Sequence, residues 1–264
     1  PGKKMCKGWR GHGKAPAGVV TRQRRYVSEQ EVDAQAAAGL FLFGDRRHQV
    51  VLFAFDGLPV ARGDAEVRQI QWPRMGKVGM ELKTNAALII IDQQKGILHP
   101  KLGRRNNPQA EERILELLGH WRRTGRPVIH VQHLSRSVDS VFWPQQSGVE
   151  FQERFQPSIG EWLIQKQVPD AFCSTGLEAS LREAGIDQLI IVGVATHNSV
   201  ESTARTAGNL GFEAWVVEDA CFTFDKADFF GNAHSAEEVH AMSLGNLHGE
   251  YATVVSAASI LMND

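Results

Sequence analysis

Residues 80–264 alternate between short apolar runs and amphipathic helical patterns, and this alternation restricts the possible folds more than any other feature of the sequence. A continuous apolar run is typical of a strand buried on both faces of a parallel sheet. A helical pattern between two such runs supplies the crossover that parallel strands need. The sequence therefore predicts an α/β fold, a three-layer doubly wound sandwich with a mostly parallel six-stranded sheet. The six expected strands are 86–92, 127–133, 161–166, 188–194, 212–219 and 251–257.

Helices are expected between these strands, and their starts carry recognisable signals. Two of them open with the spacing of a capping box, Thr175 to Glu178 and Ser235 to Glu238. Another begins after an Asn and a Pro and places apolar residues on one face. The expected helices cover 106–123, 175–185, 198–211 and 235–247.

The front of the chain differs from the rest in charge and in pattern. Residues 1–79 contain 14 Lys and Arg against 7 Asp and Glu, a net +7, whereas residues 80–264 have a net charge of −8. Only 49–55, "QVVLFAF", has a strand pattern. We therefore expect residues 1–79 to be a basic, irregular N-terminal extension of domain 80–264, with Met75 or Met80 as the natural start. A small added domain is the alternative.

Charge, hydropathy and cysteine content exclude several classes of protein. The acidic body lacks the clustered Lys and Arg that bind nucleic acid. The apolar stretch 36–44 is far too short to span a membrane or to act as a signal peptide. Cys6, Cys173 and Cys221 lie far apart without a CxxC pair, so neither a disulfide framework nor a zinc site is indicated. We expect a cytoplasmic protein with no membrane and no nucleic-acid partner.

Three polar residues follow expected strands at the edge of the sheet where ligands bind in this fold. Asp92 ends the first strand, Lys166 ends the third, and Ser199 follows the fourth. Each residue alone has an ordinary explanation, as a turn former, a surface charge or a helix cap. Ligands of doubly wound sheets bind beyond the carboxyl ends of the strands. A carboxylate, an ammonium and a hydroxyl on that one rim therefore predict a catalytic pocket.

Separated motifs give this region a resemblance to the isochorismatase-like hydrolases, also called cysteine hydrolases, over residues 84–258. The segments "IIIDQQKG", "QKQVPDAF" and "GVATHNSVESTAR" are similar to that family's DxQ, KxxxSAF and GxxTxxCVxxTAR motifs, in order and spacing. The resemblance implies the isochorismatase-like fold. It implies that Asp92 is the acid or base and Lys166 its cationic partner, and that Ser199 occupies the position of the nucleophilic cysteine.

The same resemblance makes predictions about the turn before Ser199. Many relatives have a non-proline cis peptide bond there, which would join Val194 and Ala195. The backbone N–H groups around Ala195 and Ser199 would then form an oxyanion hole.

The sequence departs from the family pattern at two positions. Asp170 stands where the family usually has Ser, which would alter the charge beside Lys166. Ser199 replaces the cysteine, and a serine hydroxyl needs a well-placed base to become a nucleophile, whereas a thiol ionises with modest help. No histidine is placed by the motif to serve as that base.

The missing thiol decides between the functions that the resemblance implies. Hydrolysis of a vinyl ether of the isochorismate type needs an acid and water but no covalent step, so it is the preferred hypothesis. The alternative is an amidohydrolase of the nicotinamidase, maleamate or carbamoyl-amide type, with a natural or engineered Cys-to-Ser replacement. A non-catalytic binding protein is the third hypothesis. The presence of both Asp92 and Lys166 argues against it, because a buried charge pair is costly in a scaffold.

Further residues are expected to bind the substrate or to pack beside it. They are Gln94, His133, Phe142, Trp143, Ala195, His197 and Asn198. His130 and His133 are three residues apart, and so on opposite faces of a strand, which makes a shared metal ion implausible. His130 is expected in the core. We therefore predict no metal and no cofactor, a small-molecule substrate, and a homo-oligomer, either a dimer or a tetramer.

Overall fold

The computed structural model describes residues 41–44, 50–53 and 81–262, and the chain divides into two units, Pro1–Met75 and Gly76–Asp264. In the first unit, β1 (Phe41–Gly44) pairs antiparallel with β2 (Val50–Phe53). Strand β2 falls within the predicted strand 49–55, and β1 is an addition to the prediction. The other expectations for residues 1–79 lie outside the described residues.

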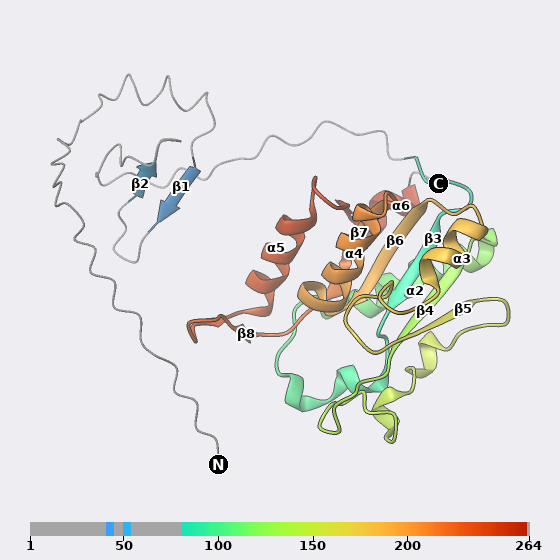
Figure 1. The fold of residues 1–264 in the computed structure, drawn as a ribbon, viewed down its shortest axis with the longest axis horizontal. Coiled ribbons are helices and arrows are strands. Elements are labelled where there is room, and N and C mark those ends of the chain that lie inside the picture. Colours follow the sequence, from blue (N-terminus) through green and yellow to red (C-terminus); the bar gives the residue numbers. More distant parts are fainter. Residues whose placement is uncertain (1–40, 45–49, 54–80, 263–264) are drawn as a thin grey trace, which may run out of the picture. The chain divides into compact units, whose positions relative to one another are not determined.

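The second unit is built on a six-stranded sheet in which every neighbouring pair of strands is parallel (Figure 1). The order across the sheet is β10-β7-β6-β3-β4-β5. All six predicted strands are present, and the predicted α/β fold is confirmed. The strands are β3 (Ala87–Ile91), β4 (Val128–His133), β5 (Trp162–Lys166), β6 (Gln188–Val194), β7 (Glu213–Phe222) and β10 (Thr253–Val255).

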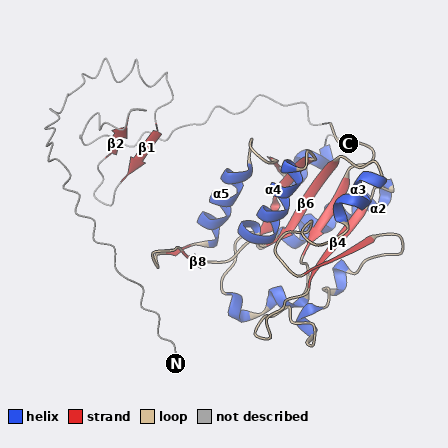
Figure 2. Ribbon diagram, in the orientation of Figure 1, coloured by secondary structure: helices blue, strands red, loops and turns tan. Residues whose placement is uncertain are grey.

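Helices cover both faces of this sheet and complete the three layers (Figure 2). Alternate residues of β3 show the division. Ile89 and Ile91 pack in the core shared with α3 (Leu177–Glu183), α4 (Glu201–Asn209) and α5 (Ala236–Leu247). Leu88 and Ile90 pack in the core shared with α2 (Ala110–Thr124) and α6 (Ala257–Met262). None of the helices in the described part of the chain is long and apolar enough to cross a membrane.

The starts of the helices agree only partly with the sequence signals. Ser235 and Glu238 form the predicted capping box at the start of α5. The helix α3 starts at Leu177 after Gly176, without the predicted capping box. The Thr175 hydroxyl donates to the carbonyl of Ala171 (2.6 Å) and accepts from the N–H of Leu177 (3.3 Å). Short elements in the connections are η1 (Lys95–Leu98), η2 (Pro100–Leu102), η3 (Ser147–Val149), η4 (Glu153–Phe155), η5 (Thr196–Val200), β8 (Lys226–Ala227) and β9 (Ala233–His234).

The strands β3 and β6 lie side by side at the point where the direction of strand succession reverses. From β3 the chain proceeds to β4 and β5 on one side, and from β6 to β7 and β10 on the other. Such a reversal opens a crevice at the carboxyl ends of the two strands. Gly193 near the end of β6 has φ 120°, and a Cβ there would lie 2.2 Å from the carbonyl oxygen of Ile91. Only glycine allows the two strands to approach this closely.

Candidate active site

Asp92, Lys166 and Ser199 meet in the crevice at the ends of β3, β5 and β6. The ammonium of Lys166 lies 2.8 Å from Oδ2 of Asp92 and donates to Oγ of Ser199 at 3.2 Å. All three residues are buried, with Lys166 only 1% exposed. A buried lysine and a buried carboxylate are tolerable only because each satisfies the other. The three residues that the sequence predicts on one rim of the sheet therefore lie together, with Lys166 in contact with the other two.

One oxygen of the Asp92 carboxyl group has no hydrogen-bond partner among the described residues. Oδ2 accepts from Lys166, whereas Oδ1 is buried and unpartnered. Asp92 also has φ 54°, in the left-handed region that few residues other than Gly, Asn and Asp adopt. Asp92 is one of the residues that line a pocket.

Ser199 lies in a wide turn, η5, that joins β6 to α4. The N–H of Val200 donates to the carbonyl of Ala195, a spacing of five residues, at 3.2 Å. Such π-turns are frequent at functional sites. Helix α4 begins only at Glu201, so the helix predicted from residue 198 starts with this turn. The peptide bond between Val194 and Ala195 is cis, as the resemblance predicts.

Helix α5 holds this turn from outside the pocket. Oγ1 of Thr196 lies 2.8 Å from Nδ1 of His240, and the hydroxyl of Ser243 donates to the carbonyl of Thr196 at 3.0 Å. All three residues are buried. The backbone around Ser199 is therefore fixed by two side chains of a neighbouring helix.

The pocket above these residues has a volume of about 380 Å³. Of the predicted residues, Asp92, His133, Phe142, Ala195, Asn198 and Ser199 line it. Lys166 lies behind Asp92 and Ser199 and is not part of the lining. The remaining wall is mostly apolar. Sequence reasoning missed Ile97, Leu102, Ser140, Gln167, Pro169, Val194 and Phe224.

His133 is a neutral member of the site. Burial, and secondarily the charge of Lys166, lower the pKa of His133 below its ordinary value. Its Nδ1 lies 3.4 Å from the Lys166 ammonium, which can only donate, so Nδ1 accepts and the imidazole proton resides on Nε2. The ring meets Phe142 edge to face, with 5.7 Å between the ring centroids.

Gln94 does not line the pocket, because its amide is fully used inside the protein. Nε2 donates to the carbonyls of His133 (2.9 Å) and Val149 (2.8 Å), and Oε1 accepts from the N–H of His133 (2.8 Å). The residue is completely buried. Gln94 is therefore a clamp on the end of β4, and the prediction that it contacts the substrate is wrong.

His197 and Trp143 are also absent from the lining of this pocket in the described structure. Nδ1 of His197 bonds to the hydroxyl of Thr223, which draws the side chain away from the pocket. The loop turns tightly where the N–H of Trp143 donates to the carbonyl of Ser140 (3.1 Å), and Ser140 and Phe142 supply the wall instead. No sequence signal distinguishes Phe142 from Trp143 on this loop.

Two further predicted residues lie elsewhere. The carboxylate of Asp170 accepts from the N–H of Phe172 (2.9 Å) and the hydroxyl of Thr206 (2.7 Å), so its charge is engaged away from Lys166. His130 is buried and bonds to Glu161 at 2.8 Å. Within the described residues, no three His, Cys, Asp or Glu side chains are placed to hold a metal ion.

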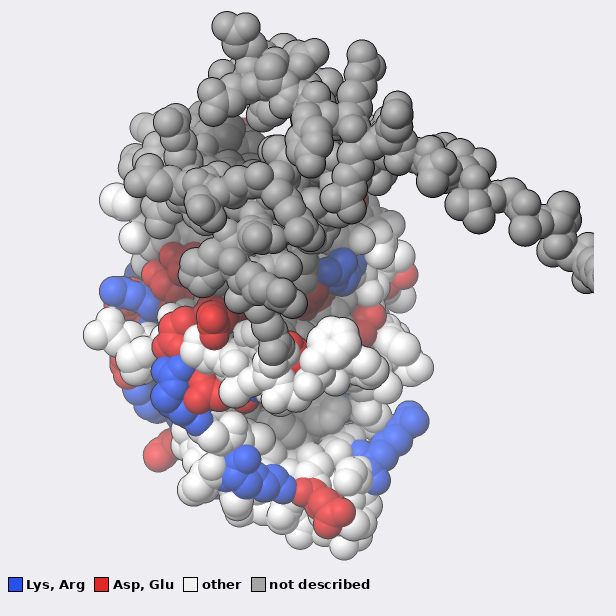
Figure 3. Space-filling view, turned by 90° about the vertical axis from the view of Figure 1, so that its left-hand side faces the viewer, with Lys and Arg blue, Asp and Glu red and all other residues white. Residues whose placement is uncertain are grey.

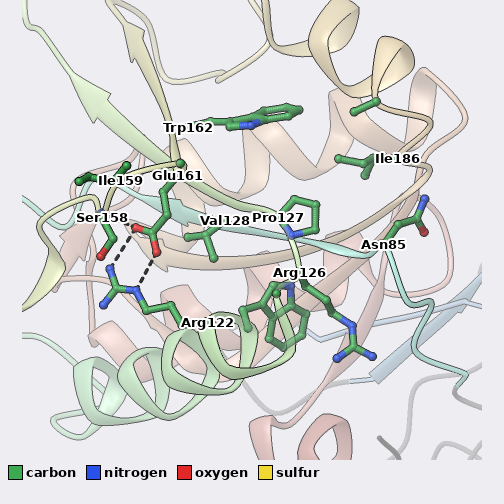
Figure 4. Close-up of a pocket in the computed structure, with 14 residues that line it drawn as sticks. Asn85, Arg122, Arg126, Pro127, Val128, Ser158, Ile159, Glu161, Trp162 and Ile186 are labelled. Atoms are coloured by element: carbon green, nitrogen blue, oxygen red, sulfur yellow. Dashed lines mark hydrogen bonds and ion pairs between the residues drawn. The ribbon is translucent and has the colours of Figure 1, made fainter.

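A larger pocket of about 610 Å³ lies at the opposite edge of the sheet, beside the starts of β4 and β5 (Figure 4). Its charged side chains and the amide of Asn85 are already paired. The guanidinium of Arg122 donates to Glu161 at 2.7 and 3.0 Å, and the amide of Asn85 donates to the carbonyl of Gly185 at 2.7 Å. This edge carries the amino ends of the strands, where α/β sheets do not place their catalytic groups. The pocket of Asp92 and Ser199 is therefore the candidate active site.

Fold and pocket together define a doubly wound α/β protein with a buried Asp–Lys pair at its switch point. The model of the isochorismatase domain matches residues 86–259. The chain is 37% identical over 183 residues to the isochorismatase family protein YrdC of Bacillus subtilis, covering 69% of this chain and 97% of YrdC. The solved structure of an isochorismatase-family protein from Chromobacterium violaceum matches with a TM-score of 0.68 and 47% identity, covering 70% of this chain and 96% of that one.

A relative with a named activity is nicotinamidase 3 of Arabidopsis thaliana, 26% identical over 183 residues, with 64% of this chain and 84% of that protein covered. The chain belongs to the isochorismatase family, and its second unit is a hydrolase domain with the family's fold.

Proposed function

We propose that this hydrolase cleaves the enol ether bond of a small molecule, in the manner of isochorismate hydrolysis, with Asp92 as the proton donor. The observation that carries the proposal is that Asp92 lines the pocket and has one carboxyl oxygen, the buried Oδ1, without a hydrogen-bond partner among the described residues. Oδ2 accepts from Lys166, so a proton that the Asp92 carboxylate takes up for the reaction would bind to Oδ1. That proton has no acceptor among the described residues, and a bound substrate would be its acceptor.

The reaction needs no covalent intermediate. Oδ1 of Asp92 transfers its proton to the terminal carbon of the enol ether, which leaves a positive charge shared between the adjacent carbon and the ether oxygen. Water attacks that carbon and returns a proton to Oδ1. The resulting hemiketal collapses to a keto acid and an alcohol, which is pyruvate and a dihydroxy acid in the case of isochorismate.

Ser199 has a binding role in this proposal. Its Oγ accepts a hydrogen bond from the Lys166 ammonium, which withdraws electron density from the oxygen that a nucleophile would need. Its own hydroxyl proton is left to donate to the substrate or to the attacking water.

Amide hydrolysis is the second candidate, because Ser199 lines the pocket beside Ala195 and contacts Lys166, where a nucleophile would lie. The similarity to a nicotinamidase supports the same candidate. In this case Ser199→Cys should raise amide hydrolysis by orders of magnitude, because Lys166 and the start of α4 stabilise a thiolate but not an alkoxide.

The test compares the wild-type chain with Asp92→Asn, Ser199→Ala and Ser199→Cys, measuring pyruvate release from isochorismate and ammonia release from nicotinamide. Asp92→Asn should lose about 10²-fold or more of the pyruvate release. Ser199→Ala should lose only severalfold, as should the control Ser140→Ala, which removes another hydroxyl from the same pocket. Activity lost in Ser199→Ala but kept in Asp92→Asn would contradict the mechanism. Binding of isochorismate without turnover in the wild type would support the non-catalytic alternative.

A further inference from the structure

Lys166 has a third hydrogen-bond partner, and it is His133. The Lys166 ammonium lies 2.8 Å from Oδ2 of Asp92 and 3.2 Å from Oγ of Ser199. Nδ1 of His133 lies 3.4 Å from the same ammonium. An ammonium carries three N–H donors and no acceptor. The three donors of Lys166 therefore meet three acceptors, one on the residue after β3, one on the last residue of β4 and one in η5.

Water cannot replace these acceptors, because the Lys166 side chain is buried. On the face of the molecule shown in Figure 3, Lys and Arg side chains lie at the surface among Asp and Glu side chains, where water solvates an N–H that has no protein partner. Lys166, in contrast, is only 1% exposed. A buried N–H without an acceptor bears the full cost of its desolvation. Loss of one acceptor should therefore displace the Lys166 ammonium.

The register of the sheet places His133 beside Lys166. The strands β4 and β5 are parallel, and His133 and Lys166 are register partners, so their side chains stand on the same face of the sheet. A lysine that extends from the end of β5 to the end of β3 must pass the end of β4, which is His133. The contact between the ring and the ammonium thus follows from the strand order and register.

The ring of His133 is held on both sides. Gln94 accepts from the N–H of His133 at 2.8 Å and donates to its carbonyl at 2.9 Å, which fixes the backbone. Phe142 meets the ring edge to face. His133 is therefore anchored independently of Lys166, and it can act as a fixed support for the longer and more flexible lysine.

Only the neutral form of His133 can accept a hydrogen bond from Lys166. A protonated imidazole carries an N–H on each nitrogen and would set one of them against the ammonium. Burial, and next the charge of Lys166, lower the pKa of His133. The charge of Asp92 and a hydrogen bond to the backbone of Val168 act in the opposite direction without cancelling this. His133 is therefore neutral at pH 7.

We propose that His133 is a positioning residue that holds the Lys166 ammonium between Asp92 and Ser199 by accepting its third hydrogen bond. Lys166 then has no N–H left for a substrate and acts only through the two side chains that line the pocket. The inference goes beyond the proposed reaction and does not depend on it, because it holds whichever bond the hydrolase cleaves.

NMR of the full chain with nitrogen-15-labelled histidine tests the contact without a substrate. Long-range proton–nitrogen spectra distinguish the two neutral tautomers of an imidazole, and the signals missing from His133→Asn assign the ring. At pH 7 His133 should carry its proton on Nε2, with Nδ1 unprotonated. A proton on Nδ1, or a ring that is protonated at pH 7, would overturn the proposal. This measurement needs only the wild-type fold.

A thiol at position 199 reports the position of the ammonium. Ser199→Cys, combined with Cys6→Ser and Cys173→Ser, leaves one reactive thiol, because Cys221 is fully buried. The rate of its alkylation by iodoacetamide is measured against pH. Adding His133→Leu should move the midpoint of this curve upward by about one unit or more, because a displaced ammonium stabilises the thiolate less.

His133→Asn is the matched rescue variant, since its side-chain oxygen can accept from Lys166 where Nδ1 did, and it should restore the midpoint. The control His234→Leu removes a histidine whose side chain is 42% exposed on β9, and it should leave the midpoint unchanged. An unchanged midpoint in His133→Leu, or an equal shift in His133→Leu and His133→Asn, would contradict the proposal. Neither measurement uses turnover, so its failure is distinct from a failure of the proposed reaction.

Discussion

The ammonium of Lys166 contacts both Oδ2 of Asp92 at 2.8 Å and Oγ of Ser199 at 3.2 Å, so one buried cation joins the two groups that line the pocket. Lys166 is 74 residues from Asp92 and 33 from Ser199 in the sequence. Lys166 must reach past β4 to contact Asp92, because β4 lies between β3, which ends at Asp92, and β5, which ends at Lys166. Removal of Lys166 would therefore affect the stability of the domain as well as its chemistry.

Lys166→Met should destabilise the protein by about 3–5 kcal/mol, because it leaves the buried Asp92 carboxylate without its partner. The double variant Lys166→Met/Asp92→Asn should be less destabilised than the single variant, since no unpaired charge remains. Urea unfolding measures both. Lys83→Met is the matched control, because the Lys83–Asp187 pair is 40% and 60% exposed and should contribute less than about 1 kcal/mol. Equal losses in the single and double variants would mean that the buried pair is not the source of the effect.

Gln94→Leu should lower the free energy of unfolding by roughly 2–4 kcal/mol, because it leaves the backbone N–H and carbonyl of His133 without the partner that Gln94 provides, whereas the carbonyl of Val149 keeps its bond from Gln132. It should also reduce activity by misplacing His133. Gln165→Leu removes a similar side chain from an exposed position on β5 and should change stability by less than about 0.5 kcal/mol. Urea unfolding of the two variants checks the contrast, and equal stability would show that the clamp contributes nothing.

Glu161 should make the protein sensitive to acid. Burial alone would raise the pKa of Glu161, but hydrogen bonds from Arg122, the N–H of Ser158 and His130 outweigh burial and hold the pKa at about 2. A carboxylate with a depressed pKa stabilises the fold above its unfolded pKa of about 4.3, and this contribution is lost as the pH falls toward 2.

At pH 7 the melting temperature of Glu161→Gln should therefore be lower than that of the wild type. As the pH falls from about 4.5, close to the unfolded pKa, to 2, the melting temperature of the variant should fall less steeply than that of the wild type. Glu112→Gln is the control, because its pair with Arg154 is 57% and 58% exposed. Calorimetry across this pH range decides the matter, and parallel curves for wild type and Glu161→Gln would refute the assignment.

Deleting residues 1–79 should leave the melting temperature and the activity of the hydrolase domain unchanged. The described cores of this domain begin at Leu82 and use no earlier residue. Deleting residues 1–84 instead removes Leu82, which is 8% exposed and packs in the core beside Trp121, and should lower the melting temperature by several degrees. A large drop on the shorter deletion would show that residues 1–79 pack on the domain.

The sequence predicts positions at strand ends far better than directions of side chains. Asp92, Lys166 and Ser199 could be placed because each follows a long apolar run whose end is easily located. Gln94 could not be understood in this way, because its clamp depends on Val149, in a loop whose course is set by tertiary contacts. The same loop decides that Phe142 and not Trp143 faces the pocket.

Local signals also compete with bonds that the sequence does not show. Ser235 forms its capping box with Glu238, whereas the Thr175 hydroxyl donates to the carbonyl of Ala171 and accepts from the N–H of Leu177. Asp170 was expected to act on Lys166, yet the hydroxyl of Thr206, 36 residues later, holds its carboxylate. The position of the Asp170 carboxylate therefore depends on a contact between segments that meet only in the folded protein.

The adjacency of β3 and β6 has a consequence for how the protein is made. During translation β3 emerges first, and the strand that must lie beside it at the centre of the sheet emerges only after β4, β5 and α3. Pairing between such distant segments is slow, because a long loop must close before any contact is gained. A nascent chain that ends before residue 188 has three of the six strands and lacks Ser199, so premature termination there yields no partly active enzyme.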